Sequence, residues 1–153
     1  MTRTATAPVR PTTASDQTPR RVFAALTGLA ALAILLQGLW AGKFLEHDGA
    51  RDAAGSWIEV HATDGEVAIA LAALATIWAL FRLRHRRDLV IGGAVLTVLL
   101  VLEAYIGGLI VDDGKDSLTP LHIPLALLLM AVAVWLPFRA GQGRAESLTA
   151  DRS

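Results

Sequence analysis

Two histidines stand near the beginning of two long apolar stretches of the chain. His61 lies in WIEVHATDGEVAIALAALATIWALF, and His122 lies in LTPLHIPLALLLMAVAVWLPF. A neutral imidazole carries a free nitrogen lone pair, which makes histidine a common metal ligand. Two imidazoles that face each other across an apolar space match the needs of bis-histidine haem, whose iron takes one nitrogen from each side. The question is therefore whether the fold brings these two side chains together.

Long apolar blocks dominate the rest of the chain, and 54% of its 153 residues are hydrophobic. A helix that crosses a bilayer needs about 20 mostly apolar residues, and only helices or closed barrels satisfy their backbone groups there. The sequence thus predicts an all-α membrane protein, an antiparallel up-and-down bundle of four transmembrane helices. We expect one domain at 22–138, between a disordered tail at 1–21 and a second tail at 139–153. The expected spans are 22–45, 60–82, 89–111 and 119–138.

The basic residues are distributed unevenly over the segments between these spans. Eleven of the 14 lie before the first span, between the second and third spans, or after the fourth span: Arg3, Arg10, Arg20, Arg21, Arg82, Arg84, Arg86, Arg87, Arg139, Arg144 and Arg152. The positive-inside rule makes this side cytoplasmic, which predicts a plasma-membrane protein with both termini inside. No aromatic residues alternate with these arginines, so the expected partner is the lipid bilayer and not nucleic acid. The absence of cysteine excludes disulfides, thiolate metal sites and c-type haem attachment.

The predicted topology places the two histidines at similar depth. The second and fourth helices run in the same direction and lie diagonally across the bundle, where cofactor sites are built from facing side chains. Below His61, the small residues Gly65 and Ala68 fall on the same helix face and leave space. We therefore expect b-type haem between His61 and His122, with Glu59 as a second-shell partner at the outer end.

Three further polar residues are expected at similar depth and leave other interpretations open. Gln37, Glu66 and Glu103 form a predicted polar layer, and acids inside a membrane are costly unless neutral, paired or near water. Such a layer would fit a small proton-coupled transporter module that uses Glu103. It would equally fit a non-enzymatic structural or accessory subunit, in which hydrogen bonds lock the helices together. A zinc or iron site made by His61 and His122 with Asp64 is a further alternative.

The pattern resembles the heme A synthase family. Members of that family have eight spans in two four-helix halves, and in each half a histidine on the second helix and one on the fourth face a haem site. Residues 22–138 look like one such half, with His61 and His122 in the ligand positions and Glu59 near the family's glutamate in EVH. The VH…LHIPL pattern is also similar to that of small four-helix membrane proteins of high-GC actinobacteria, most of which have no assigned function.

The chain departs from that family in several respects. The second half is absent, the glutamate stands two residues before His61 instead of three, and HA replaces the family's HR pair. The outer loop has no cysteine pair. One half matches only one of the family's two haem sites unless two copies associate, so a homodimer or a larger membrane complex would be a fitting state. The resemblance thus implies a haem-binding site but not the synthase activity.

Overall fold

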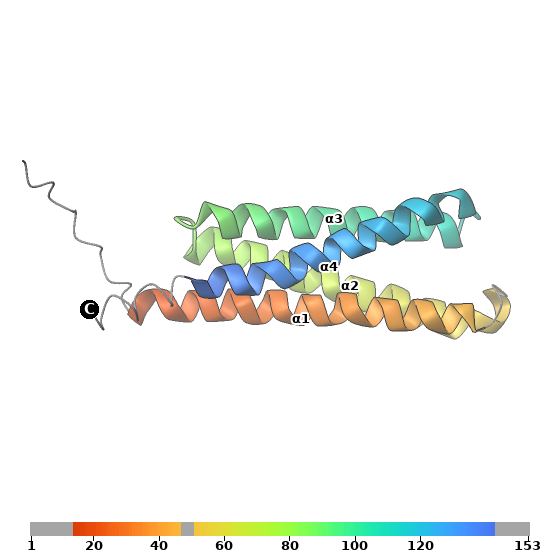
Figure 1. Ribbon diagram of the computed structural model, residues 1–153, viewed down its shortest axis with the longest axis horizontal. Helices are drawn as coiled ribbons and strands as arrows, with labels where there is room; N and C mark the ends of the chain where they lie inside the picture. Colours follow the sequence, from red (N-terminus) through yellow and green to blue (C-terminus); the bar gives the residue numbers. More distant parts are fainter. Residues whose placement is uncertain (1–13, 47–50, 143–153) are drawn as a thin grey trace, which may run out of the picture.

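Four long α-helices make up the computed structural model, which describes residues 14–46 and 51–142. They are α1 (Ala14–Leu45), α2 (Arg51–Arg82), α3 (Arg87–Val111) and α4 (Thr119–Gly141), and a single 3-10 turn, η1 (Asp116–Leu118), precedes α4. Consecutive helices run antiparallel (Figure 1). Each contains a segment long and apolar enough to cross a membrane, as in a multi-pass membrane protein. The predicted all-helical, up-and-down bundle is therefore confirmed.

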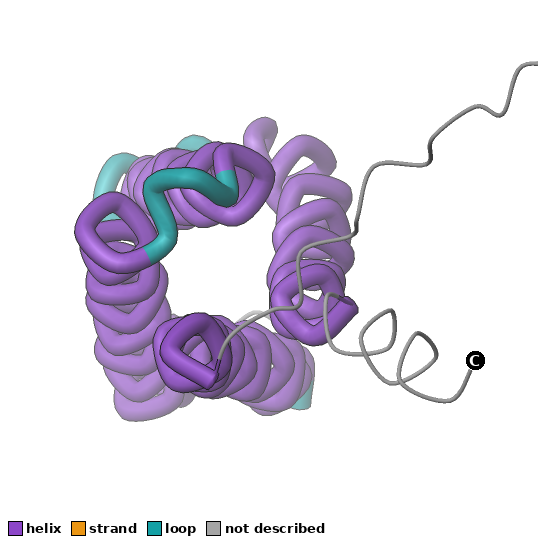
Figure 2. The backbone as a smooth tube through the Cα atoms, turned by 90° about the vertical axis from the view of Figure 1, so that its left-hand side faces the viewer, coloured by secondary structure: helices purple, strands orange, loops and turns teal. Residues whose placement is uncertain are grey.

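The helices surround a common axis, as the view along the bundle shows (Figure 2). α1 packs against α2 and α4, and α3 packs against the same two helices. α2 and α4 therefore lie on one diagonal and run in the same direction. This is the arrangement that the sequence predicts for the helices that carry His61 and His122.

All four helices extend beyond their predicted limits, although α3 does so by only two residues, beginning at Arg87 instead of 89. α1 begins at Ala14, so the prediction of a disordered tail to residue 21 is wrong for 14–21, and residues 1–13 lie outside the described part. The indole nitrogen of Trp78 donates to the carbonyl oxygen of Pro19 at 3.0 Å, which holds this first part of α1 against α2. α2 begins at Arg51 instead of 60, and α4 continues to Gly141 instead of 138. The apolar pattern of the sequence marks only the apolar part of each helix, so it gives no signal for the polar turns at the helix ends.

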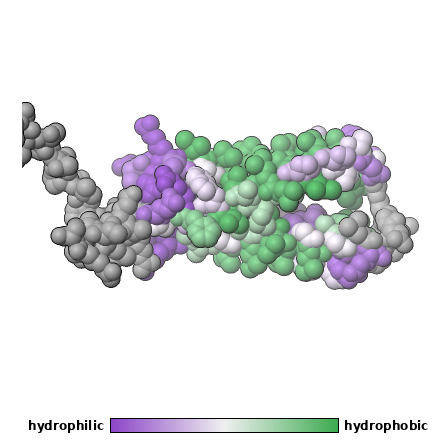
Figure 3. Space-filling view, viewed as in Figure 1, coloured by the Kyte–Doolittle hydropathy of each residue, from purple (hydrophilic) through white to green (hydrophobic). Residues whose placement is uncertain are grey.

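The core of the bundle is densest where small residues let the helices approach. Ala68, Ala72, Ala75 and Ala79 form a fully buried strip on α2. On α3, a Cβ atom at Gly93 would come within 2.9 Å of Thr76 Oγ1 on α2. The surface of the bundle is, by contrast, rich in exposed leucine, valine and phenylalanine side chains. They form an apolar belt between two polar ends (Figure 3), which is the distribution expected of a bundle that faces lipid.

The two ends of the bundle differ in charge. The arginine-rich end contains the start of α1, the α2–α3 loop and the end of α4. There Asp88 accepts hydrogen bonds from Arg86 at 2.8 Å and 3.0 Å, and Arg139 Nε lies 2.9 Å from the same carboxylate. The acidic end contains the end of α1, the start of α2 and the α3–α4 connection. Gly114 has φ +65 in that connection, a left-handed conformation that favours glycine.

Candidate functional site

Polar side chains from all four helices lie toward the acidic end of the bundle. Gln37 comes from α1, His61 from α2, Glu103 from α3 and His122 from α4. Glu103 is 8% exposed although its helix is otherwise strongly apolar. A buried acid among apolar helices is costly unless it is paired or neutral, so this group marks the candidate site.

Glu103 and His122 are the closest pair of titratable groups within this set. His122 Nδ1 lies 3.2 Å from Glu103 Oε1, although the two groups are not aligned as a hydrogen bond. A Cβ atom at Gly107, one turn further along α3, would lie 3.4 Å from His122 Cε1. The imidazole of His122 therefore lies directly on the face of α3 that carries Glu103 and Gly107.

His61 is held from α1 instead. The Gln37 amide nitrogen donates to the His61 carbonyl oxygen at 2.9 Å and to Asp64 Oδ2 at 2.8 Å. The ring of Phe44 packs edge-on against the His61 imidazole, with centroids 5.3 Å apart. These contacts fix the backbone and one side of the ring, but none of them uses a nitrogen of the imidazole.

His61 and His122 lie close enough to each other for their imidazoles to interact electrostatically. Four buried polar atoms in this region have no hydrogen-bond partner: His61 Nδ1, His122 Nδ1, Glu103 Oε1 and Glu103 Oε2. Buried polar atoms of native proteins are nearly all hydrogen-bonded, so a group of four unsatisfied atoms calls for an explanation. A bound ligand, a bound metal or a proton shared among these atoms would each explain why they have no hydrogen-bond partner.

The bundle is hollowed near the acidic end. Figure 3 shows an opening between α3 and α4 on one side and α1 and α2 on the other. His122 is the fourth residue of α4, and Gly65 lies one turn below His61, where an added Cβ atom would meet only the Gln37 amide, at 3.9 Å and 4.0 Å. Ala68, a turn further in, is fully buried by the other helices. The predicted space below His61 thus exists at Gly65 but is closed by helix packing from Ala68 onward.

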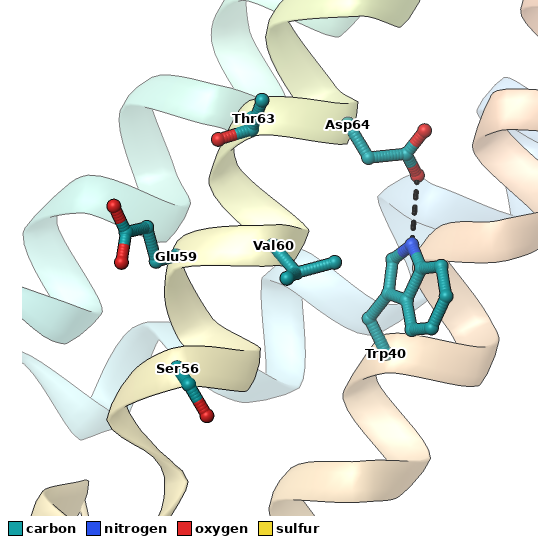
Figure 4. Close-up of a pocket in the computed structure, with 6 residues that line it drawn as sticks. All are labelled: Trp40, Ser56, Glu59, Val60, Thr63 and Asp64. Atoms are coloured by element: carbon teal, nitrogen blue, oxygen red, sulfur yellow. Dashed lines mark hydrogen bonds between the residues drawn. The ribbon is translucent and has the colours of Figure 1, made fainter.

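The structure places Glu59 and Glu66 away from the histidines. Both are exposed, and on a helix they point about 160° and about 140° away from His61. Glu59 lines a shallow open pocket with Trp40, Ser56, Val60, Thr63 and Asp64, in which it points away from Trp40 (Figure 4). The predicted polar layer therefore loses Glu66, and Glu59 does not share the face of α2 that carries His61.

Asp64 also differs from its predicted role as a metal ligand. Its carboxylate accepts hydrogen bonds from Gln37 and, at 3.2 Å, from Trp40 Nε1 (Figure 4). Across the described residues, no three histidine or acidic side chains gather in a way that could hold a metal ion. The structure therefore does not bring His61, Asp64 and His122 together as a three-ligand zinc or iron site.

Two features of the site were not predicted from the sequence. They are the contact of Gly107 with His122 and the hydrogen bond from Trp40 to Asp64. Gly107 stands four residues after Glu103, and that helical spacing was the available signal for a shared face. Comparison of the chain with protein-family models, with curated proteins and with solved structures finds no match. Fold and site thus define, over the described residues, an all-helical, four-helix bundle of membrane-spanning length with two partly buried histidines and a buried acid.

Proposed function

We propose that this protein is a plasma-membrane protein that binds b-type haem between α2 and α4, with His61 and His122 as the axial ligands. The observation that carries the proposal is the pair of partly buried imidazoles on diagonal helices, each with a buried and unsatisfied Nδ1 atom in a largely apolar bundle. Haem binding would use the imidazoles, while aliphatic side chains would surround the porphyrin.

The residues present fit such a group in their chemistry. The two imidazoles supply the nitrogen donors, and Nδ1 of each ring is buried without a hydrogen-bond partner among the described residues. Haem, when bound, would supply one-electron redox chemistry, which suits electron transfer or haem handling. The protein would hold the iron, exclude water with its aliphatic side chains and keep the two imidazoles at one depth in the bilayer.

The orientation in the membrane is part of the same proposal. The arginine-rich end, with both chain termini, faces the cytoplasm by the positive-inside rule. The histidine pair then lies in the outer half of the bilayer, a few residues below the outer surface. A redox partner or a haem donor would therefore approach from the outer side or from within the outer leaflet.

Absorption spectra of the detergent-purified protein test the proposal, recorded oxidised and dithionite-reduced after reconstitution with haem. The expected result is a sharp Soret band with reduced α and β bands that disappear in both His61→Ala and His122→Ala. His85→Ala is the matched control, because His85 is exposed at the arginine-rich end. A wild-type protein that stays colourless with added haem would overturn the proposal.

The burial of Glu103 favours a second candidate function. An acid 3.2 Å from a histidine in an apolar core can pass a proton, as a small proton-coupled transporter requires. In that case substrate uptake into proteoliposomes would depend on a proton gradient and would be lost in Glu103→Gln. Uptake that persists in this variant would exclude the candidate, and a purely structural or accessory role would then be left for the polar residues.

A further inference from the structure

Glu103 and Gly107 face His122 from the same side of α3, one helical turn apart. His122 Nδ1 lies 3.2 Å from Glu103 Oε1, and the ring carbon Cε1 lies against Gly107. We propose that these two residues, the positioning pair, fix the tautomer and direction of His122, so that Nδ1 carries the proton and Nε2 is free to bind iron. This inference rests on the proposed haem function.

Burial leaves Glu103 as the partner for Nδ1 of His122. Both carboxylate oxygens of Glu103 and Nδ1 of His122 are buried, and no other described residue hydrogen-bonds to any of them. An unsatisfied buried acceptor and an unsatisfied buried donor at 3.2 Å satisfy each other at the lowest cost. The N–H of His122 is not yet aligned with the Glu103 oxygen. A modest rotation about χ2 of His122, a torsion with a broad range in histidine, aligns them.

This arrangement corresponds to a general rule of metal sites. A histidine that binds a metal through one nitrogen almost always donates its other N–H to a carboxylate, a carbonyl or water, which fixes the ring and raises its basicity. Glu103 is that carboxylate for His122. Among the described residues no carboxylate is hydrogen-bonded to His61, and Asp64, three residues further along α2, is bound by Gln37 and Trp40.

Gly107 contributes by its lack of a side chain. A Cβ atom there would already be in contact with His122 Cε1 at 3.4 Å, so a branched side chain would displace the ring from Glu103. At the neighbouring Gly108, a Cβ atom would meet only Asp112 Oδ2 at 3.8 Å. Gly107→Val and Gly108→Val therefore form a matched pair, which differ in contact with His122 but not in helix propensity.

Two measurements test the positioning pair, and the first does not need haem. Nitrogen-15 NMR of histidine-labelled protein, with the signals assigned through His→Ala variants, reads the tautomer of His122. We expect an Nδ1-protonated ring in the wild type and in Glu103→Gln, which keeps an acceptor oxygen, and a loss of this preference in Glu103→Leu. The second measurement is haem affinity, which we expect to fall about 10–100-fold in Glu103→Leu.

The controls separate positioning from folding and from the proposed function. Glu103→Gln and Gly108→Val should bind haem nearly as the wild type does, whereas Gly107→Val should bind it weakly. Glu66→Gln removes an acid from an exposed face of α2 and should change neither measurement. Each variant is first checked for helical content by circular dichroism, and Gly107→Val carries the test if Glu103→Leu does not fold.

Each outcome decides one of the two proposals. If Glu103→Leu or Gly107→Val keeps both the tautomer and the affinity of the wild type, the positioning pair is overturned while haem binding stands. The positioning pair is also overturned if Glu103→Gln binds haem as weakly as Glu103→Leu, because the oxygen acceptor of glutamine should preserve the orientation of the His122 ring. If the wild type shows the Nδ1-protonated ring but binds no haem, the haem function fails and the positioning pair stands.

Discussion

The side-chain amide of Gln37 donates to the carbonyl oxygen of His61 at 2.9 Å and so ties α1 to the turn of α2 that carries the histidine. The same nitrogen also donates to Asp64 Oδ2 at 2.8 Å. One side chain therefore determines where His61 lies relative to α1, although it does not touch the imidazole nitrogens.

Replacing Gln37 with leucine should loosen this part of the bundle. Interhelical hydrogen bonds in membrane proteins contribute about 0.6 kcal/mol each on average, so the loss of two predicts about 1 kcal/mol of destabilisation. Unfolding in mixed micelles measures it. Gln142→Leu is the control, because Gln142 is exposed and bonds only to Arg139 of its own helix within the described residues. Equal stability of Gln37→Leu and the wild type would show that the bond is not needed.

Gly93→Ala should destabilise the contact between α2 and α3. The added Cβ would lie 2.9 Å from Thr76 Oγ1 and 3.5 Å from Thr76 Cα, and the hydroxyl is held by a hydrogen bond to Ala72 at 2.8 Å. Overpacking of this kind costs about 1–3 kcal/mol. Gly28→Ala is the matched control, because nothing lies within 4 Å of its Cβ position. A Gly93→Ala protein as stable as Gly28→Ala would contradict the close packing seen here.

Asp88→Asn should weaken the link between the α2–α3 loop and the end of α4. Asp88 is paired with both Arg86 and Arg139, and Arg86 Nη2 also donates to the Arg139 carbonyl oxygen at 3.3 Å. Partly exposed ion pairs contribute about 1 kcal/mol or less, and salt screens them. The loss should therefore be measurable at low salt and smaller at high salt. Asp113→Asn, which breaks an exposed pair with Lys115, should leave stability unchanged.

The orientation can be tested with single cysteines, since the chain has none of its own. In intact cells, a membrane-impermeant maleimide should label Ser117→Cys in η1. It should label His85→Cys in the α2–α3 loop only after the membrane is opened. Both positions are exposed, so accessibility in the folded protein does not favour either one. Labelling of His85→Cys from outside would reverse the proposed topology.

Much of the architecture was predictable because the bilayer imposes strong and simple constraints on a sequence. Four apolar blocks predicted four antiparallel helices, and the order of short loops predicted which helices neighbour each other. Helix ends were less predictable. The first turns of α1 and α2 are polar, so hydropathy gave no signal for them, and contacts such as Trp78 with Pro19 extend the helix beyond the apolar block.

The candidate site was predictable only in part. The placement of His61 and His122 on diagonal helices followed from topology alone. Glu103 was recognised as an unusual buried acid, but its contact with His122 depends on how α3 is rotated about its own axis. Glu59 and Glu66 were expected near the histidines because depth is easy to count along a helix, whereas the direction of a side chain must be read from packing.

By itself, the sequence of this protein determined the number of helices and their antiparallel order, because hydropathy acts on each segment separately. Only the tertiary structure decided which polar groups meet: Glu103 with His122, and Gln37 with His61 and Asp64. The physical reason is that helix rotation is set by the close packing of small residues such as Gly93 and Gly107 against neighbouring side chains. Such packing is a property of pairs of helices, and no single segment encodes it.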